Sequence, residues 1–278
     1  MNRKIEFRPI EFAFSPAIDK HWCGGSPFKT HWLNSYTLII PEGEKFILRS
    51  TKRYGGRVDG ELKGRLLALQ AQEALHSKEH ERFYKNLKIQ GYKIDGYVRA
   101  YRFVSFDILE KLGTLIFPNL LLSTAAGLEH VNAVLAEIGL THDFLEGADL
   151  QVRPLFEWHY AEEIEHKAVC HDVLQLVAPS YLLRISGLFF ASVTFVNFLI
   201  AGTAALLWQD RQLVRGKSLR EAARFFFKEP GFFFKYCSAV RVYLRPRFHP
   251  DERDNYHLAD GIFAHHGTSV ETRRIRKL

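Results

Sequence analysis

Cysteine is scarce in this chain of 278 residues, and its three cysteines lie far apart. Cys23, Cys170 and Cys237 form no CxxC pair, which excludes a disulfide framework and a zinc site built from thiolates. We therefore expect a reducing compartment, the cytoplasm. The first residues, MNRKIEFRPIEF, also contain no apolar segment of the kind that forms the core of a secretion signal.

Alternation of apolar and polar residues, the pattern of a half-buried strand, is also missing, so we expect an all-α fold. Glycine and proline residues separate five helical stretches, which we place at 41–54, 60–89, 97–113, 118–138 and 149–177. The expected organisation is an irregular N-terminal arm over 1–40, a helical bundle over 41–178, hydrophobic and aromatic helices over 179–245, and a polar, basic tail over 246–278.

No early block of Lys and Arg is present, although 38 basic residues outnumber 31 acidic ones and the formal net charge is +7. The basic residues concentrate after residue 210, beside clusters of phenylalanine. Nucleic-acid binding has only the net charge in its favour, so we expect no nucleic-acid partner. Cations beside aromatic rings suit the surface of an anionic membrane better.

Two stretches combine Glu and His at helical spacing. They are Glu73-x-x-His76-x-x-x-His80 and His159-x-x-x-Glu163-x-x-His166. A helix turns about 100° per residue, so positions 0, +4 and +7 fall within roughly a 60° arc. Two such faces opposed inside a helical bundle form a pocket of carboxylate oxygens and imidazole nitrogens, the ligands that iron and manganese prefer. The alternative is a solvated polar face on each helix.

A dinuclear site in a bundle also needs two further carboxylates, one from each remaining helix. The candidates are Glu44, in PEGEKFILRS, and Glu129, in LLLSTAAGLEHVNAVLAEIGL. Glu129 lies in a mostly apolar segment, where a lone carboxylate is costly to bury unless it is paired or binds a cation. The alternatives are a pair with His130 for Glu129 and, for Glu44, a solvated acid in a first helical turn.

The order of these residues resembles that of ferritin-like di-iron carboxylate proteins, with one Glu on helices one and three and Glu-x-x-His on helices two and four. His159 resembles the third histidine ligand of the di-iron arylamine N-oxygenase branch. Over nearly its whole length the chain is also similar to a bacterial family labelled "predicted metal-dependent hydrolase". The matching stretches are Pro41-Glu42-Gly43-Glu44, Gln72-Glu73-Ala74-Leu75-His76, Glu162-Glu163-Ile164-Glu165-His166-Lys167 and Arg245-Pro246-Arg247-Phe248-His249-Pro250. The resemblance implies a ferritin-like four-helix bundle core with extra C-terminal hydrophobic helices.

The expected ligand set would hold two iron ions, with manganese as the alternative metal. Its members are Glu44, Glu73, His76, Glu129, His159, Glu163 and His166. We expect Glu73 and Glu163 to bridge the ions, and Glu44 and Glu129 to bind one ion each. No catalytic residue is expected beyond these ligands.

The histidines differ in their expected roles. His76 and His166 would each hold one ion, and His159 would join His166 on the same ion. His80 is either a further ligand or a hydrogen-bonding neighbour of one. Asp172 either hydrogen-bonds a ligand imidazole or faces solvent beside the preceding histidine.

The ligand set favours a di-iron oxidase or oxygenase acting on a small apolar, lipid-like substrate. An external electron donor would be required, because no flavin or iron–sulfur motif is present. One alternative is a metal-dependent hydrolase, in which the two ions activate water. A second alternative is a metal-binding bundle without turnover.

Residues 185–208, ISGLFFASVTFVNFLIAGTAALLW, carry no charge and are long enough to cross a hydrocarbon core of roughly 30 Å. The alternative is a helix buried against the bundle. Two Phe triplets follow, at 225–227 and 232–234, flanked by Lys and Arg. They suit either an interfacial membrane segment or a clamp on the core. We expect association with the cytoplasmic face of the inner membrane, and self-association if no lipid covers these residues.

Overall fold

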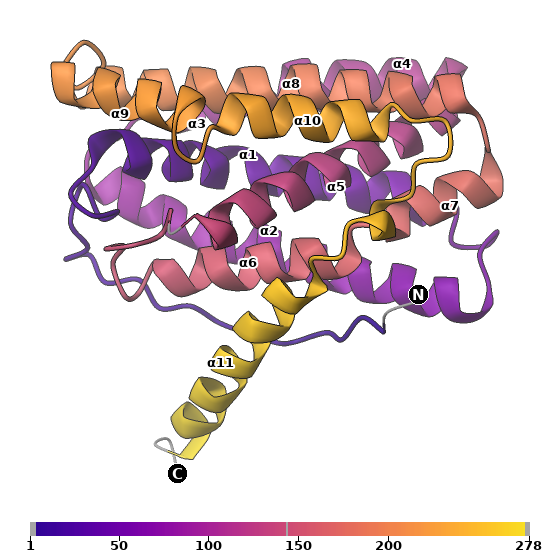
Figure 1. The fold of residues 1–278 in the computed structure, drawn as a ribbon, viewed down its shortest axis with the longest axis horizontal. Helices are drawn as coiled ribbons and strands as arrows, with labels where there is room; N and C mark the ends of the chain where they lie inside the picture. The colour runs from indigo at the N-terminus through magenta and orange to yellow at the C-terminus, as the bar shows by residue number, and fades with distance from the viewer. Residues whose placement is uncertain (1–3, 143, 276–278) are drawn as a thin grey trace.

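The computed structural model describes residues 4–142 and 144–275, and these residues fold almost wholly into helices (Figure 1). Within those ranges the only β-type pairing is an isolated bridge between Cys23 and Ala148. The predicted all-α fold is therefore confirmed.

The elements follow one another along the chain with short connections. They are α1 (Pro27–Lys52), α2 (Gly60–Ile89), α3 (Asp95–Arg102), the π-helical turn η1 (Phe103–Asp107), α4 (Ile108–Ile116), α5 (Pro118–Thr141), α6 (Arg153–His166), α7 (Val169–Val177), α8 (Tyr181–Gln209), α9 (Gly216–Phe227), α10 (Phe232–Tyr243), the 3-10 turn η2 (Pro250–Glu252) and α11 (Tyr256–Ile275).

The first helix begins earlier than the sequence predicted. We expected an irregular arm up to residue 40, but α1 begins at Pro27. The Ser26 hydroxyl accepts a hydrogen bond from the Lys29 backbone N–H, which caps the helix, and a proline at the first helical position loses no intrahelical bond. The helix then continues through Pro41, so Pro41 lies inside the helix and does not mark its start.

Other boundaries also differ from the expected ones. The helix expected at 60–89 is confirmed as α2, with the same bounds. The stretch expected at 97–113 is divided into α3, η1 and α4 by the π-helical turn. The stretch expected at 149–177 is divided into α6 and α7, which are separated at Lys167 and Ala168. The tail expected to be polar contains α11.

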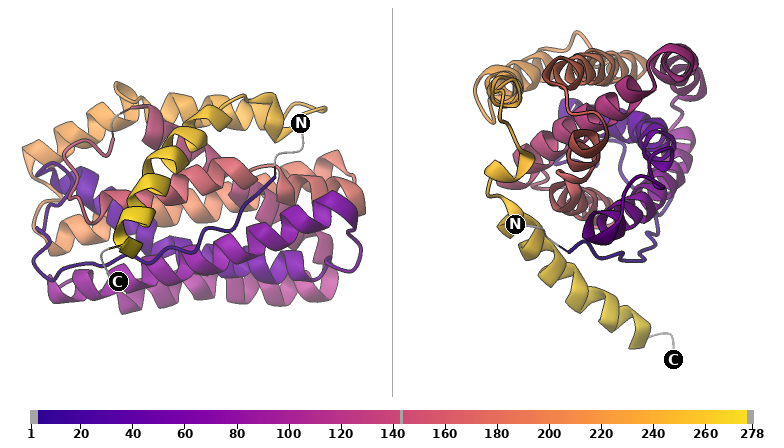
Figure 2. Two further views of the ribbon diagram at one scale, coloured as in Figure 1. Left: turned by 90° about the horizontal axis from the view of Figure 1, so that it is seen from below. Right: turned by 90° about the vertical axis from the view of Figure 1, so that its right-hand side faces the viewer.

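Four helices, α1, α2, α5 and α6, run along the long axis of the molecule and enclose its centre (Figures 1 and 2). Helix α8 packs along α1 and α5, with α9 and α10 beside it in the same outer layer. Helix α11 crosses α6 on the opposite side of the bundle. The N-terminal arm also passes α6, so every residue of this helix from Leu155 to His166 is buried.

Helix α8 approaches the bundle closely through its glycines. A Cβ atom at Gly187 would lie 2.3 Å from the carbonyl oxygen of Ser123 in α5. A Cβ atom at Gly202 would lie 2.3 Å from the Ser35 hydroxyl in α1. These two positions therefore let the backbone of α8 rest directly on the two helices below it.

Candidate metal centre

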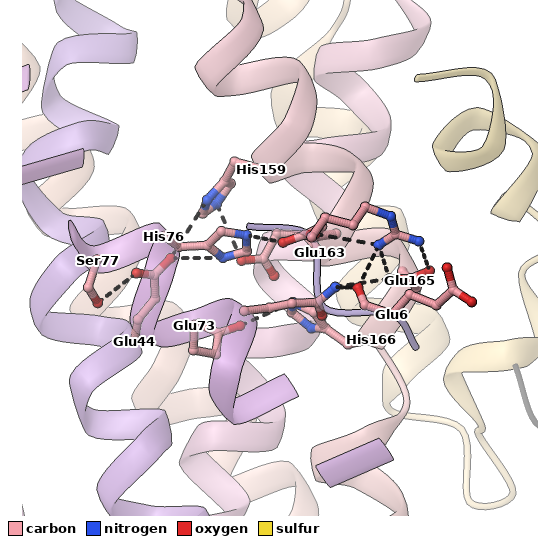
Figure 3. Close-up of polar contacts among 12 residues, drawn as sticks. Glu6, Glu44, Glu73, His76, Ser77, His159, Glu163, Glu165 and His166 are labelled. Carbon is pink, nitrogen blue, oxygen red and sulfur yellow. Dashed lines mark hydrogen bonds and ion pairs between the residues drawn. The ribbon is translucent and has the colours of Figure 1, made fainter. Parts of the chain in front are cut away.

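Seven predicted ligands lie in the core between four helices, and all of them except Glu129 are labelled in Figure 3. Their side chains are at most 1% exposed. They are Glu44 from α1, Glu73 and His76 from α2, Glu129 from α5, and His159, Glu163 and His166 from α6. The helical spacing predicted from the sequence therefore places both Glu-x-x-His pairs on the inner faces of their helices, facing one another.

Six of the seven residues form two overlapping groups. Within each group one potential ligand atom from every residue lies within 4.8 Å of the others. The first group is Glu44, His76, His159 and Glu163; the second is Glu73, His76, Glu163 and His166. His76 and Glu163 belong to both groups, so the two candidate positions are neighbours. A carboxylate shared in this way can bind two ions with its two oxygens, as predicted for Glu163.

The first group converges on Glu44. Its Oε1 atom lies 3.4 Å from Nδ1 of His76 and 3.7 Å from Nδ1 of His159. The other oxygen, Oε2, accepts a hydrogen bond of 2.9 Å from the Ser77 hydroxyl. Since Ser77 fixes one carboxylate oxygen, the other is directed at two imidazoles.

The second group pairs α2 with α6. Nε2 of His166 lies 3.1 Å from Oε1 of Glu73. Glu163 lies between the groups: its Oε1 atom is 3.3 Å from Nε2 of His159 and accepts a hydrogen bond of 3.3 Å from the Asn132 amide. The two groups thus form one continuous cluster rather than two separate sites.

Buried ligand atoms without a hydrogen bond provide the test of whether metal ions fit. The unpaired atoms include Oε1 of Glu44, both carboxylate oxygens of Glu73, Oε2 of Glu163, Nδ1 of His76, Nδ1 of His159 and Nε2 of His166. Buried polar atoms without partners are rare in folded proteins and costly. Here they face one another and match the ligand types of iron and manganese. The residues therefore fit a pair of divalent cations.

The buried carboxylates resist ionisation when no cation is near. Burial raises the pKa of Glu44 and Glu163 well above the usual value, and repulsion from Glu73 raises both further. Burial, together with the charge of Glu129, raises the pKa of Glu73 to about 7, although His166 opposes the change. Two bound divalent ions would compensate these negative charges and remove the repulsion.

The three histidines of the cluster are not equivalent. Burial lowers the pKa of His76 and His159 well below the usual value, so both imidazoles are neutral and can bind a metal ion. Burial also lowers the pKa of His166, but the attraction of Glu129 and Glu73 outweighs it and raises that pKa well above the usual value. A cation bound beside His166 would take the place of the positive charge that these carboxylates favour on the imidazole.

Glu129 lies in neither group. Its Oε2 atom is 2.8 Å from Nδ1 of His166, on the side of the ring that faces away from Glu73. Its Oε1 atom accepts from the Cys170 thiol at 3.8 Å. The structure thus places Glu129 as a neighbour that orients His166, and it contacts this histidine rather than the adjacent His130.

The histidine beyond the first motif, His80, is buried beside the cluster but also lies outside both groups. Its Nδ1 atom is 3.1 Å from the Thr37 hydroxyl, and its ring centre lies 4.9 Å from that of His159. His159 in turn shares its group with His76 and Glu44, whereas we expected it beside His166.

Asp172 does not hydrogen-bond a ligand imidazole. One of its carboxylate oxygens accepts from Arg65 at 2.8 Å and the other lies 2.9 Å from Nε2 of His249. Asp172, His249 and the adjacent His171 form a third group of potential ligands. However, Arg65 already compensates the charge of Asp172, and Nδ1 of His249 accepts from a backbone N–H, which leaves the proton on Nε2. Neither ring nitrogen of His171 makes a hydrogen bond among the described residues, whereas Asp172 and His249 already have partners, so this group offers a metal ion fewer unpaired ligand atoms than the central cluster.

Sequence reasoning missed the residues behind the ligands. The Glu-x-x-His spacing did not select Glu162 and Glu165, but their side chains are at most 1% exposed. Oε2 of Glu162 lies 3.0 Å from Nε2 of His76, which leaves Nδ1 of that ring for a metal ion. Arg8 of the N-terminal arm donates two hydrogen bonds to Glu165, of 2.7 and 2.9 Å, and one of 3.4 Å to Glu162.

Tyr36 holds the outer nitrogen of another ligand. Its hydroxyl oxygen lies 2.8 Å from Nε2 of His159, and its ring packs against Phe195 of α8. Burial, with the negative charge of Glu163, raises the pKa of Tyr36 well above its usual value, so the hydroxyl keeps its proton. The sequence contained a weak indication of this role, because Tyr36 lies eight residues before Glu44 on the same helix.

Buried carboxylates and imidazoles contributed by four helices, with ligand atoms that lack other partners, define a helical protein with a candidate dinuclear metal centre. A comparison with protein families identifies the chain further. The model of the family described as "Predicted metal-dependent hydrolase" matches residues 6–254, and the chain belongs to this family, as the sequence motifs predicted. Neither the curated proteins nor the solved structures that were searched gave a match. The buried cluster agrees with the metal dependence in the family description.

Proposed function

We propose that this chain is a dinuclear metalloenzyme in which two iron ions react with dioxygen to oxidise a small apolar substrate. One observation carries the proposal: buried carboxylates and imidazoles converge from four helices with unpaired ligand atoms. The chain order of these residues resembles that of ferritin-like di-iron proteins, which build their centres from the same donor set. Manganese prefers similar ligands and is the alternative metal.

The two groups assign the residues that would hold the ions. Glu44, His76 and His159 would bind one ion, while Glu73 and His166 would bind the other. Glu163 belongs to both groups and would bridge them. Ferrous ions held in this way would supply electrons to dioxygen. An external electron donor would then return the iron to the ferrous state.

The protein itself orients the ligand rings, excludes water from the centre and holds the ring nitrogens that face away from the metal ions. Glu162 and Tyr36 hold the outer nitrogens of His76 and His159, which fixes the direction in which each ring presents its other nitrogen. The ligands are almost completely shielded from water. A small apolar reactant such as dioxygen can enter such a core more easily than a polar group can.

Metal-dependent hydrolysis is the second candidate, and the family description favours it. In that reaction the ions would act as Lewis acids on a water molecule and on the bond to be cleaved. A hydrolase of this kind must admit both a polar substrate group and water to the metals. The burial of all the ligand side chains is the observation that favours oxidation over hydrolysis.

Metal analysis tests whether the cluster is a metal centre. We expect about two metal ions per chain in the parent protein, purified without oxygen, and a loss of at least one in Glu163→Gln, which keeps the side-chain shape but removes the bridging charge. Glu157→Gln is the matched control on the same helix, because Glu157 pairs with the partly exposed Arg153. Equal metal contents in the parent and both variants would refute the metal centre.

Exposure to oxygen separates the two chemistries. The iron-loaded, reduced chain should consume dioxygen in proportion to its iron content, as measured with an oxygen electrode, and Glu163→Gln should not. If the chain instead retains zinc, is inert to oxygen and cleaves members of an ester, amide or phosphoester panel, hydrolysis is the correct function. If it binds metal but does neither, the bundle only stores or senses metal.

A further inference from the structure

The outer face of α8 is apolar and uncovered. Leu182, Phe189, Val193, Ile200 and Trp208 follow one another along this face, and their side chains are between 43% and 71% exposed. The spacing places them on one side of the helix, opposite the residues that pack on α1 and α5. Single exposed apolar residues are common, but a stripe along a helix of 29 residues is not.

The neighbouring helices extend this apolar surface. Helices α4 and α10 flank α8 in the same outer layer (Figures 1 and 2). In α4, Leu112 and Leu115 are 55% and 83% exposed. In α10, Phe233 and Phe234 are at least half exposed. We call the exposed side chains of α4, α8 and α10 the apolar face.

Cations are concentrated next to the apolar face. Residues 211–247, which contain α9 and α10, carry ten Lys and Arg but only two Glu, a net charge of +8. The whole chain has a net charge of +7, so the other residues together are close to neutral. All ten basic side chains are exposed. An apolar surface bordered by cations is complementary to a lipid layer with anionic headgroups.

Helix α8 is long and apolar enough to cross a membrane by length and composition, and 39% of its most apolar window is buried. Its attachment to the bundle points to a different orientation. The Ser123 hydroxyl of α5 donates to the carbonyl of Leu183 at 2.6 Å, and the Ser35 hydroxyl of α1 donates to that of Leu199 at 2.9 Å. Because α8 lies parallel to the bundle, a spanning α8 would carry the charged surface of α2 into hydrocarbon.

We infer that the apolar face docks this chain onto an anionic lipid bilayer, with α8 lying in the plane of the membrane and its outer side chains inserted into one leaflet. The Lys and Arg residues of 211–247 contact the headgroups. This inference does not depend on whether the metal centre oxidises or hydrolyses its substrate.

Helix α8 lies between the apolar face and the centre. A groove of about 540 Å³ runs between α8 and α10, and its lining includes Leu188, Phe189, Tyr236 and Val240. On the inner side of α8, Phe195 packs against the Tyr36 ring, whose hydroxyl lies 2.8 Å from His159. Phe195 and Tyr36 therefore link the inner side of α8 to a metal ligand. An apolar molecule that leaves the bilayer would meet this groove first.

Sedimentation with vesicles tests the inference on the full chain. We expect binding to phosphatidylcholine vesicles that contain phosphatidylglycerol, and weaker binding to phosphatidylcholine alone or at high salt. Replacing Phe189, Phe233 and Phe234 together with Ser should weaken binding at least about tenfold. The matched control replaces Leu67 and Leu150 with Ser, because these apolar residues are also more than half exposed but lie outside the apolar face.

Charge reversal separates the headgroup contribution from insertion. Lys228→Glu with Lys235→Glu, beside the apolar face, should weaken binding to anionic vesicles by about tenfold or more, but change binding to neutral vesicles little. The control is Lys63→Glu with Lys85→Glu, two exposed positions on α2. If both pairs weaken binding equally, the attraction comes from net charge alone and the inferred orientation is wrong.

The chain contains its own reporter of insertion. Trp208 is 71% exposed on the apolar face, whereas Trp22, Trp32 and Trp158 are at most 3% exposed. Lipids with brominated acyl chains should quench the fluorescence of the parent chain but not that of Trp208→Phe. Absence of quenching, or a stable dimer in solution that covers Trp208 and does not bind vesicles, would overturn the inference.

Discussion

Each histidine of the candidate centre uses one ring nitrogen for the protein and keeps the other for a metal ion. Glu162 contacts the outer nitrogen of His76, and Glu129 contacts that of His166. For His159 the partner is the neutral hydroxyl of Tyr36. Partners of this kind fix the tautomer and direction of a ligand ring before the metal arrives, which strengthens metal binding.

Tyr36→Phe should weaken metal binding without displacing a ligand. The substitution removes only the hydroxyl that orients His159, so we expect metal affinity to fall by about 10- to 100-fold while the fold persists. Competition with a coloured chelator measures the affinity. Tyr160→Phe is the control, since Tyr160 is a buried tyrosine of α6 whose ring centre lies 5.7 Å from that of Tyr36. Unchanged affinity in Tyr36→Phe would mean that packing alone positions His159.

The titration of Glu73 leads to a prediction for the metal-free protein. The pKa of this carboxyl is about 7 in the folded chain, against 4.5 for an ordinary Glu. The protonated carboxyl favours the folded chain, so its contribution to the free energy of unfolding is fully present below pH 4.5. That contribution is lost as the pH rises through 7. Glu73→Gln keeps the shape but cannot ionise. The metal-free variant should thus gain stability relative to the metal-free parent between about pH 5 and pH 8.

Urea unfolding at about pH 5 and about pH 8, with a chelator present, measures the difference in the free energy of unfolding between variant and parent. Glu146→Gln, at an exposed position, is the control. A constant difference for Glu73→Gln would show that the carboxyl does not titrate in this range in the folded chain. Loss of bound metal in the same variant would identify Glu73 as a residue that is retained for binding at a cost in stability.

The sequence predicted the inner ligands because their arrangement is local. The Glu-x-x-His spacing sets the face of one helix, and that relation needs no tertiary information. The residues behind the ligands could not be predicted in this way. Glu162 is adjacent to Glu163 and faces elsewhere on α6, and its burial depends on Arg8, a residue 154 positions away. No local pattern distinguishes such a carboxylate from an ordinary surface charge.

At the scale of elements, the position of α8 depends on two of its glycines. The uncharged run predicted either a membrane segment or a buried helix, and hydropathy alone does not distinguish the two. In the structure one face packs on the bundle and the other is exposed. The packing requires Gly187 against Ser123 and Gly202 against Ser35, which are contacts between segments far apart in sequence.

Gly187→Ala should therefore destabilise the protein. The new methyl group would lie 2.1 Å from the Ser123 hydroxyl oxygen and 2.3 Å from the backbone of the same residue, so α8 would have to move away from α5. We expect a loss of about 3 kcal/mol in the free energy of unfolding, measured with denaturant. Gly64→Ala in α2 is the control, because no atom lies within 4 Å of its added Cβ. That variant should gain about 0.5–1 kcal/mol, and equal effects would contradict the packing argument.

At the scale of the whole molecule, the centre joins helices that are distant in sequence. Glu44 and His166 lie on α1 and α6, and more than 120 residues separate them. Without metal ions the same cluster places carboxylates of raised pKa in one buried volume, which opposes the packing of these helices. Metal binding and folding should therefore be strongly linked.

Removal of the metal ions should lower the stability of the whole bundle. If free metal exceeds its dissociation constant a hundredfold, one site adds about 3 kcal/mol, which corresponds to roughly 5 °C in melting temperature for a domain of this size. Calorimetry of the loaded and chelated chain measures the shift. Glu163→Gln should melt at nearly the same temperature in both conditions, because it lacks the shared ligand. A large shift in that variant would place the stabilising ion elsewhere, whereas no shift in the parent would mean that the four helices pack without help from metal ions.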